Sequence, residues 1–135
     1  MHKIIILTFL LLASPIHGGQ LDYKCETKAV YHVDDNGRLK PIISNDIESV
    51  LIGKSFTIDR TNGAVVGEPF TNSDASKIQI INKGDGVGSA FKLLSVWDDM
   101  DNRQMFIHIK EQFTSTANRF VGIPDGGGIY TGLCK

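Results

Sequence analysis

Beyond its first twenty residues, the chain is divided into short segments in which apolar and polar side chains alternate, separated by clusters of turn-forming residues. This two-residue periodicity is typical of strands that bury one face. About seven or eight such segments follow at roughly ten-residue spacing, with no linker or repeat between them. We therefore expect an all-β fold, built as a single antiparallel barrel or sandwich. In residues 23–33 the pattern predicts one shared face for Tyr23, Cys25, Thr27, Ala29, Tyr31 and Val33.

Turn signals place two expected hairpins and one helix. Asn36-Gly37 is a strong tight-turn pair, because both residues tolerate a positive φ. Residues 60–63 (Arg-Thr-Asn-Gly) separate two strand-like segments and predict the clearest hairpin. Residues 45–48 (Asn-Asp-Ile-Glu) resemble a helix cap, which predicts a short helix over about 46–52 that ends at Gly53. Residues 69–76 are interpreted as a polar loop.

The N-terminal segment has the three parts of a secretory signal peptide. A basic start containing Lys3 precedes the mainly apolar residues 4–13, and a helix breaker and small residues follow. The apolar run is too short to span a bilayer, which takes roughly 20 residues as a helix. We expect residues 1–18 to be removed by cleavage after Gly18, with cleavage after Gly19 as the alternative.

Export determines the size and charge of the mature protein. Residues 19–135 would form a single domain of 117 residues, a comfortable size for one core. Loss of Lys3 leaves 13 basic against 15 acidic side chains, a net charge of −2. That balance gives no footprint for nucleic acid or an anionic membrane. We expect a secreted or periplasmic domain that has no cofactor, binds no nucleic acid and does not insert into a membrane.

The two cysteines, Cys25 and Cys134, lie near the two ends of the expected mature chain. In an oxidising compartment an even pair most simply forms a disulfide. A reactive role is less favoured, because no Cys-x-x-Cys spacing or neighbouring base accompanies them. We therefore predict a disulfide-closed domain in which the first and last strands are neighbours or face one another.

Three segments or pairs of residues contain side chains that suggest a chemical site. Residues 84–88 (Gly-Asp-Gly-Val-Gly) suggest a phosphate-binding loop, but such a loop leads into a helix and a strand-like segment follows here. A hairpin loop is the preferred interpretation. Only His32 and His108 remain after export, without a metal-binding spacing, although strands distant in sequence can adjoin.

Residues 98–102 (Asp-Asp-Met-Asp-Asn) concentrate oxygen ligands. An EF-hand loop starting at Asp99 needs a glycine and a glutamate at its sixth and twelfth positions, where this chain has Gln104 and Lys110. A solvated turn is favoured, and a weak calcium site at Asp99 and Asp101 is the alternative.

The mature chain resembles an uncharacterised family of small exported bacterial proteins along nearly its whole length. The residues that carry the resemblance are Tyr23, Cys25, Asn36-Gly37, Leu39, Gly53-Lys54, Phe56, Ile58-Asp59-Arg60, Gly63, Phe91-Lys92, Thr131-Gly132 and Cys134. It implies export and a compact disulfide-closed domain, with no activity attached. Tyr23-Lys24-Cys25 and Lys83-Gly84-Asp85 are more faintly similar to the periplasmic inhibitors of c-type lysozyme, which are small disulfide-bearing β-barrels.

No catalytic motif is present, so the leading hypothesis is an exported, non-enzymatic binding or interaction module. Its ligand and oligomeric state are left open, and its partner would be an envelope or extracellular protein. Polar hairpin loops on a rigid sheet are the usual place for binding. The candidate binding residues are Asp59, Arg60, Asn62, Lys83 and Asp85. The alternatives are an inhibitor of a cell-wall hydrolase, a small hydrolase that uses His32 or His108, and a structural envelope component.

Overall fold

The computed structural model describes residues 22–43, 47–84, 89–111 and 117–135. The predicted signal peptide, the predicted helix cap at residues 45–46 and Asp85 lie outside this part of the chain. Within it, nine strands and one short 3-10 helix form. The strands are β1 (Tyr23–Val33), β2 (Leu39–Pro41), β3 (Ser55–Ile58), β4 (Val65–Val66), β5 (Lys77–Lys83), β6 (Ala90–Val96), β7 (Gln104–Lys110), β8 (Asn118–Ile123) and β9 (Ile129–Cys134), and the helix is η1 (Ile47–Leu51).

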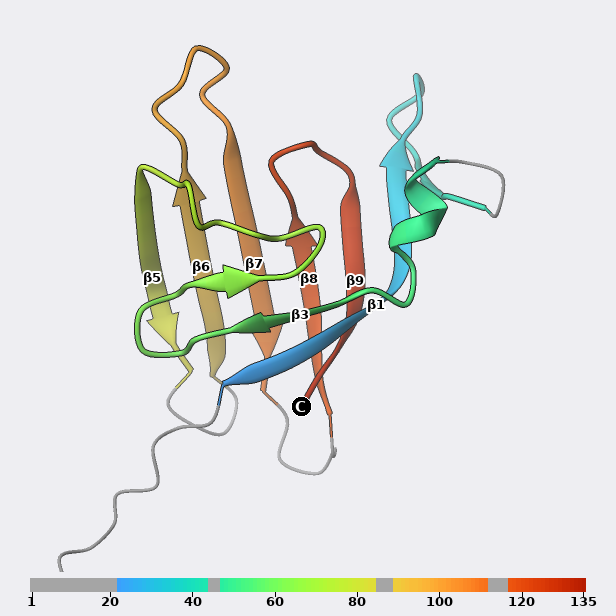
Figure 1. The fold of residues 1–135 in the computed structure, drawn as a ribbon. Coiled ribbons are helices and arrows are strands. Elements are labelled where there is room, and N and C mark those ends of the chain that lie inside the picture. The colour runs from blue at the N-terminus through green and yellow to red at the C-terminus, as the bar shows by residue number, and fades with distance from the viewer. Residues whose placement is uncertain (1–21, 44–46, 85–88, 112–116) are drawn as a thin grey trace, which may run out of the picture.

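The strands form one antiparallel sheet, which confirms the predicted all-β fold. Their order is β4-β3-β1-β9-β8-β7-β6-β5, and β2 pairs with β1 off this path. The sheet curls into a half-barrel. Strands β5 to β9 stand side by side as a back layer, while β3, β4 and the first half of β1 cross in front of them (Figure 1). The count exceeds the predicted seven or eight because β2, which is only 3 residues long, lies in a segment where no strand is predicted.

Strand β1 pairs with β9, so the first and last strands are neighbours, as predicted. The N–H groups of Lys24 and Lys135 each donate to the other residue's carbonyl, at 3.0 and 2.9 Å. The next pair along, Cys25 and Cys134, is therefore of the non-hydrogen-bonded kind, in which side chains approach most closely. The two cysteines form a disulfide with their Cα atoms 3.9 Å apart. This bond is compatible with an oxidising, exported location.

A bulge in β1 overturns the predicted face of that strand. The register with β9 shifts between Thr27 and Ala29, so Lys28 is the extra residue. Tyr23, Cys25 and Thr27 point into the core as expected, but Val30 is the next fully buried side chain. An extra residue reverses the alternation beyond it. The predicted shared face is therefore wrong for Ala29, Tyr31 and Val33, which face outward.

The predicted turns are present. Thr57 and Ile58 of β3 pair with Val66 and Val65 of β4, which confirms the hairpin around residues 60–63. In the first hairpin, Gly37 has a φ of 76°, whereas Asn36, the other residue of the predicted turn pair, does not have a positive φ. The predicted helix is a 3-10 turn over residues 47–51. It ends before Gly53, whose φ of 84° requires glycine.

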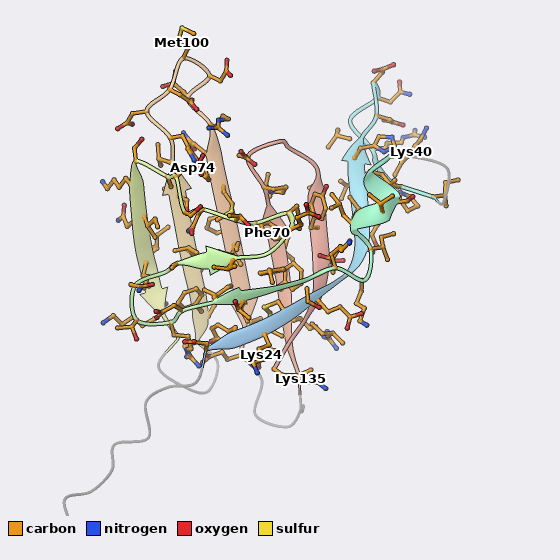
Figure 2. The ribbon with its side chains drawn as sticks, viewed as in Figure 1. Lys24, Lys40, Phe70, Asp74, Met100 and Lys135 are labelled. Atoms are coloured by element: carbon orange, nitrogen blue, oxygen red, sulfur yellow. A yellow bond between two sulfur atoms is a disulfide. The ribbon has the colours of Figure 1, made fainter. Side chains whose placement is uncertain are left out.

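Aromatic rings fill the space between the two layers. Phe56, Phe70, Phe120 and Tyr130 pack with ring centroids 4.7–6.0 Å apart. Phe70 lies near the centre of the molecule (Figure 2), although it comes from the segment predicted as a polar loop. Its ring occupies the space next to Gly122, where an added Cβ would lie 2.5 Å from the ring. Residues 69–76 are a loop, as predicted, but this one seals the core.

Asn72, from the same loop, is a buried polar residue whose hydrogen bonds are satisfied. Its Nδ2 donates to the carbonyl of Gly63 at 3.0 Å and to Ser95 Oγ at 2.9 Å, and its Oδ1 accepts from the N–H of Val65 at 2.7 Å. A buried amide with three partners fixes the loop against β4 and β6. Among the described residues, no helix has the length and apolar character needed to cross a membrane.

Candidate functional site

The predicted binding residues Asp59 and Asn62 hold their own turn. Asp59 Oδ1 accepts from the N–H of Thr61 at 2.7 Å, and Asn62 Oδ1 accepts from the N–H of Ala64 at 2.8 Å. Side chains used in this way substitute for backbone partners and stabilise the turn. Their observed contacts are therefore local.

Arg60 joins this turn to the end of β5. Its Nη2 donates to the carbonyl oxygens of Gly84 at 3.0 Å and of Lys83 at 3.3 Å. The structure thus brings two of the predicted residues, Arg60 and Lys83, together through the backbone of Lys83, whose side chain stays exposed. The remaining candidate, Asp85, lies outside the described residues.

Arg60 also belongs to a cluster of side chains that no sequence motif predicts. Its Nη2 lies 2.6 Å from Glu111 Oε1, and the Tyr23 hydroxyl donates to the same carboxylate oxygen. The Arg60 guanidinium stacks 4.3 Å from the centroid of the Tyr23 ring, and Ser89 Oγ donates to Glu111 Oε2 at 3.4 Å. The Arg60 and Glu111 side chains are only 12% and 13% exposed.

Burial and the hydrogen bond to Glu111 raise the pKa of Tyr23 well above its usual value. The phenol is therefore a neutral donor at physiological pH and cannot serve as a base. The charges of Arg60 and Glu111 are paired with each other, although the buried Nε of Arg60 has no hydrogen-bond partner among the described residues. We interpret the cluster as a structural tie between the start of β1, the β3–β4 turn and the end of β7.

The predicted calcium residues lie in the β6–β7 turn. Asp99 Oδ2 accepts from Arg103 Nε at 2.7 Å, and this bond holds the pKa of the Asp99 carboxyl below its usual value. Arg103 also binds Asp125 across the neighbouring turn at 2.7 Å. Asp101 is exposed. In the described part of the chain, no three metal-ligating side chains come close enough to hold an ion together.

The two histidines lie on opposite faces of the sheet. His108 lies on the outward face of β7, between the buried Ile107 and Ile109. His32 lies on the same side of β1 as the buried Val30, which is the inward face. Three strand spacings separate β7 from β1 in the sheet, which is about 14 Å. A hydrolase site that uses both histidines is therefore not supported by the geometry.

A groove in the outer face of the front layer is the strongest candidate site. It has a volume of about 510 Å³ and runs over β1, β3, β4 and the end of β9. We call it the lysine groove. The side chains that define it are Lys24, Lys28, Lys135, Thr57, Val66 and Leu133. Among the described residues that line it, Glu26 is the one acidic side chain, and its carboxylate is bound to Lys28 at 2.6 Å.

Two lysines lie directly opposite each other in this groove. The paired N–H and C=O groups of Lys24 and Lys135 place both exposed side chains on the outward face of the β1–β9 ladder. The two residues are close together at the lower edge of the molecule (Figure 2). Thr57 faces Lys24 from the other side, followed by Val66. Neither ammonium group forms an ion pair with a carboxylate among the described residues.

The chain matches no protein-family model, no curated protein and no solved structure.

The sequence offered part of the signal for the lysine groove. The alternation in residues 23–27 already places Lys24 on the outward face. The partner positions, Thr57 and Lys135, depend on strand pairing between segments more than 30 residues apart. No local pattern reports that register, so the lysine pair was missed.

Proposed function

We propose that the protein is an exported, non-enzymatic binding module that uses the lysine groove to hold an acidic stretch of a partner protein. The partner would lie in the envelope or outside the cell. The observation that supports this most directly is the opposition of Lys24 and Lys135. Like charges directly opposite on paired strands destabilise a sheet. A carboxylate bound between the two ammonium groups would turn that repulsion into attraction.

The remainder of the groove suits a peptide. Exposed Val66 and Leu133 offer apolar contacts on either side of the lysines, with 66% and 40% of their surface accessible. A volume of about 510 Å³ lies within the usual range for a binding pocket. The disulfide fixes the floor of the groove, because Cys25 directly follows Lys24 and Cys134 directly precedes Lys135. A preorganised floor reduces the entropy lost on binding.

The proposal is tested with a fluorescent oligoglutamate peptide, titrated with the protein at low salt and followed by anisotropy. The double variant Lys24→Glu/Lys135→Glu should bind the peptide at least about tenfold more weakly, equivalent to about 1.4 kcal/mol. The matched control, Lys77→Glu/Lys83→Glu, changes two exposed lysines on β5 by the same charge and should bind within about twofold of wild type.

Two results would count against the proposal. Equal losses in both double variants would mean that only the overall charge matters. Absence of peptide binding by the wild type at millimolar concentration would show that the groove is not a binding site for acidic peptides.

A benzoylphenylalanine crosslinker at Val66, compared with one at Lys77, then identifies the natural partner in an envelope extract.

A further inference from the structure

The outward face of the back layer carries a continuous row of apolar side chains. Leu94 of β6 faces Phe106 of β7, which faces Ile123 of β8. Further along the sheet, Ile129 of β9 faces Tyr31 of β1. We call these five residues the apolar row. It crosses five neighbouring strands, and the alternation with buried residues places it on the face turned away from the core.

The apolar row does not belong to the core. Its members alternate with buried residues such as Leu93 and Ile107 and therefore point outward; Ile123 is 42% exposed, and the other four are half-buried. An antiparallel sheet with one solvated face normally alternates apolar residues inward and polar residues outward. A contiguous apolar band on the outward face is typical of an interaction surface.

Basic residues lie at one end of this face. Lys110 of β7 and Arg119 of β8 are directly opposite each other, and Lys92 faces His108 one row nearer to the centre. Lys110 and Arg119 are each four residues from the apolar row, counted from Phe106 and Ile123. Four strand residues correspond to about 13 Å.

Acidic residues lie at the other end, in the turn that joins β6 to β7. Asp98 is four residues beyond Leu94, and Asp101 is five residues before Phe106. Both belong to the β6–β7 turn, which projects at the top of the molecule with Met100 at its tip (Figure 2). Neither carboxylate forms an ion pair among the described residues. The arginine of this turn, Arg103, binds Asp99 and Asp125 instead.

We propose that a second copy of this chain docks on this face, with a twofold axis running along the apolar row. Such an axis reverses the second copy end to end, so that the apolar row of one copy meets that of the other. The acidic β6–β7 turn of each copy then lies over Lys110 and Arg119 of its partner. The surface is self-complementary, as an isologous contact requires.

The expected dimer is weak. Contact over β6, β7 and β8 covers roughly 14 Å across the strands and 27 Å along them, about 400 Å² from each copy. That area lies below the usual size of a stable protein–protein interface. We expect dissociation constants in the range of roughly 10–500 μM and a marked dependence on salt.

Sedimentation velocity of the purified disulfide-bonded protein, from about 10 to 500 μM, tests the proposal. At low salt the weight-average mass should rise toward that of a dimer, and 0.5 M NaCl should reduce the association several-fold. Phe106→Asp should remain monomeric. Val66→Asp places the same charge on the opposite layer and should dimerise as wild type does, with near-UV circular dichroism showing that both variants are folded.

Charge reversal provides the second arm. Lys110→Glu/Arg119→Glu should weaken association about tenfold, and adding Asp98→Lys/Asp101→Lys in the same chain should restore it. A wild type that is monomeric at 500 μM, equal behaviour of the two aspartate variants, or failure of the fourfold variant to recover would each overturn the proposal. Apart from the control Val66→Asp, none of these variants alters a residue of the lysine groove, so the loss and the recovery of association are independent of peptide binding there.

Discussion

The guanidinium of Arg60 and the carboxylate of Glu111 lie 2.6 Å apart, and each side chain is almost nine-tenths buried. The pair ties the β3–β4 turn, which belongs to the front layer, to the end of β7 in the back layer. In the described residues, no backbone pairing joins β4 to β5 across the open side of the half-barrel. This side-chain contact therefore substitutes for the missing strand pairing.

Removing one partner of the pair should be costly. Arg60→Met leaves the Glu111 charge buried without its cation, and we expect a loss of about 3 kcal/mol in the free energy of unfolding. Glu111→Gln should cost a similar amount, while the double variant should cost clearly less than the sum. Urea unfolding of the four proteins measures this coupling. Additive losses would show that the two groups act independently.

The phenol of Tyr23 makes stability fall at alkaline pH. Its pKa is raised in the folded state, mainly by burial, so the folded protein holds this proton more tightly than the unfolded chain does. The stabilisation is fully present below about pH 10, the unfolded value, and is lost as the pH rises above it. Tyr23→Phe should flatten the decline in unfolding free energy between about pH 9.5 and 11.5. Tyr31→Phe, which changes a tyrosine outside the cluster, should follow the wild-type curve.

The disulfide should account for a large part of the stability. Cys25 and Cys134 are 109 residues apart, and a loop of that size corresponds to about 4–5 kcal/mol in the chain-entropy model. We expect Cys25→Ala/Cys134→Ala to lose that amount in urea unfolding, and wild type to lose a similar amount in the presence of reductant. A loss below about 1 kcal/mol would mean that the strand pairing alone constrains the ends.

Gly122 leaves room for the Phe70 ring. In Gly122→Ala the new Cβ would lie 2.5 Å from that ring, so the aromatic cluster must shift, at a cost of about 1–3 kcal/mol. The control is Gly126→Ala, where an added Cβ meets nothing within 4 Å. Thermal unfolding compares the two variants. Phe70→Leu in the Gly122→Ala background should cost less than Phe70→Leu alone, because the smaller side chain removes the clash.

Local patterns predicted most of the strands and turns of this fold. The segments that became β3, β5 and β7 have clear alternation, and the turn at residues 60–63 has a glycine where φ must be positive. The bulge at Lys28 could not be predicted from a local sequence pattern. Nothing in residues 23–33 signals it, because an extra residue in one strand is defined only relative to its partner.

The site residues were harder to predict because they meet only through the sheet. Glu111 directly follows β7, whose residues alternate between apolar and polar, yet its partners Tyr23 and Arg60 are 88 and 51 residues away. The opposition of Lys24 and Lys135 likewise exists only once β1 and β9 are in register. Phe70 was assigned to a polar loop because burial of a single side chain leaves no periodic pattern.

The pairing of β1 with β9 also determines the order in which the molecule can be completed during synthesis. Strands β1 to β4 form one set of local hairpins, and β5 to β9 form a meander of consecutive neighbours. Each set can assemble as its own residues emerge, but the two join only when the final strand arrives beside the first. Until then β1 presents an unpaired strand edge to the surroundings. A chain exported from its N-terminus would therefore cross the membrane before β1 and β9 have paired. The disulfide between the two cysteines would then form as the last step of maturation.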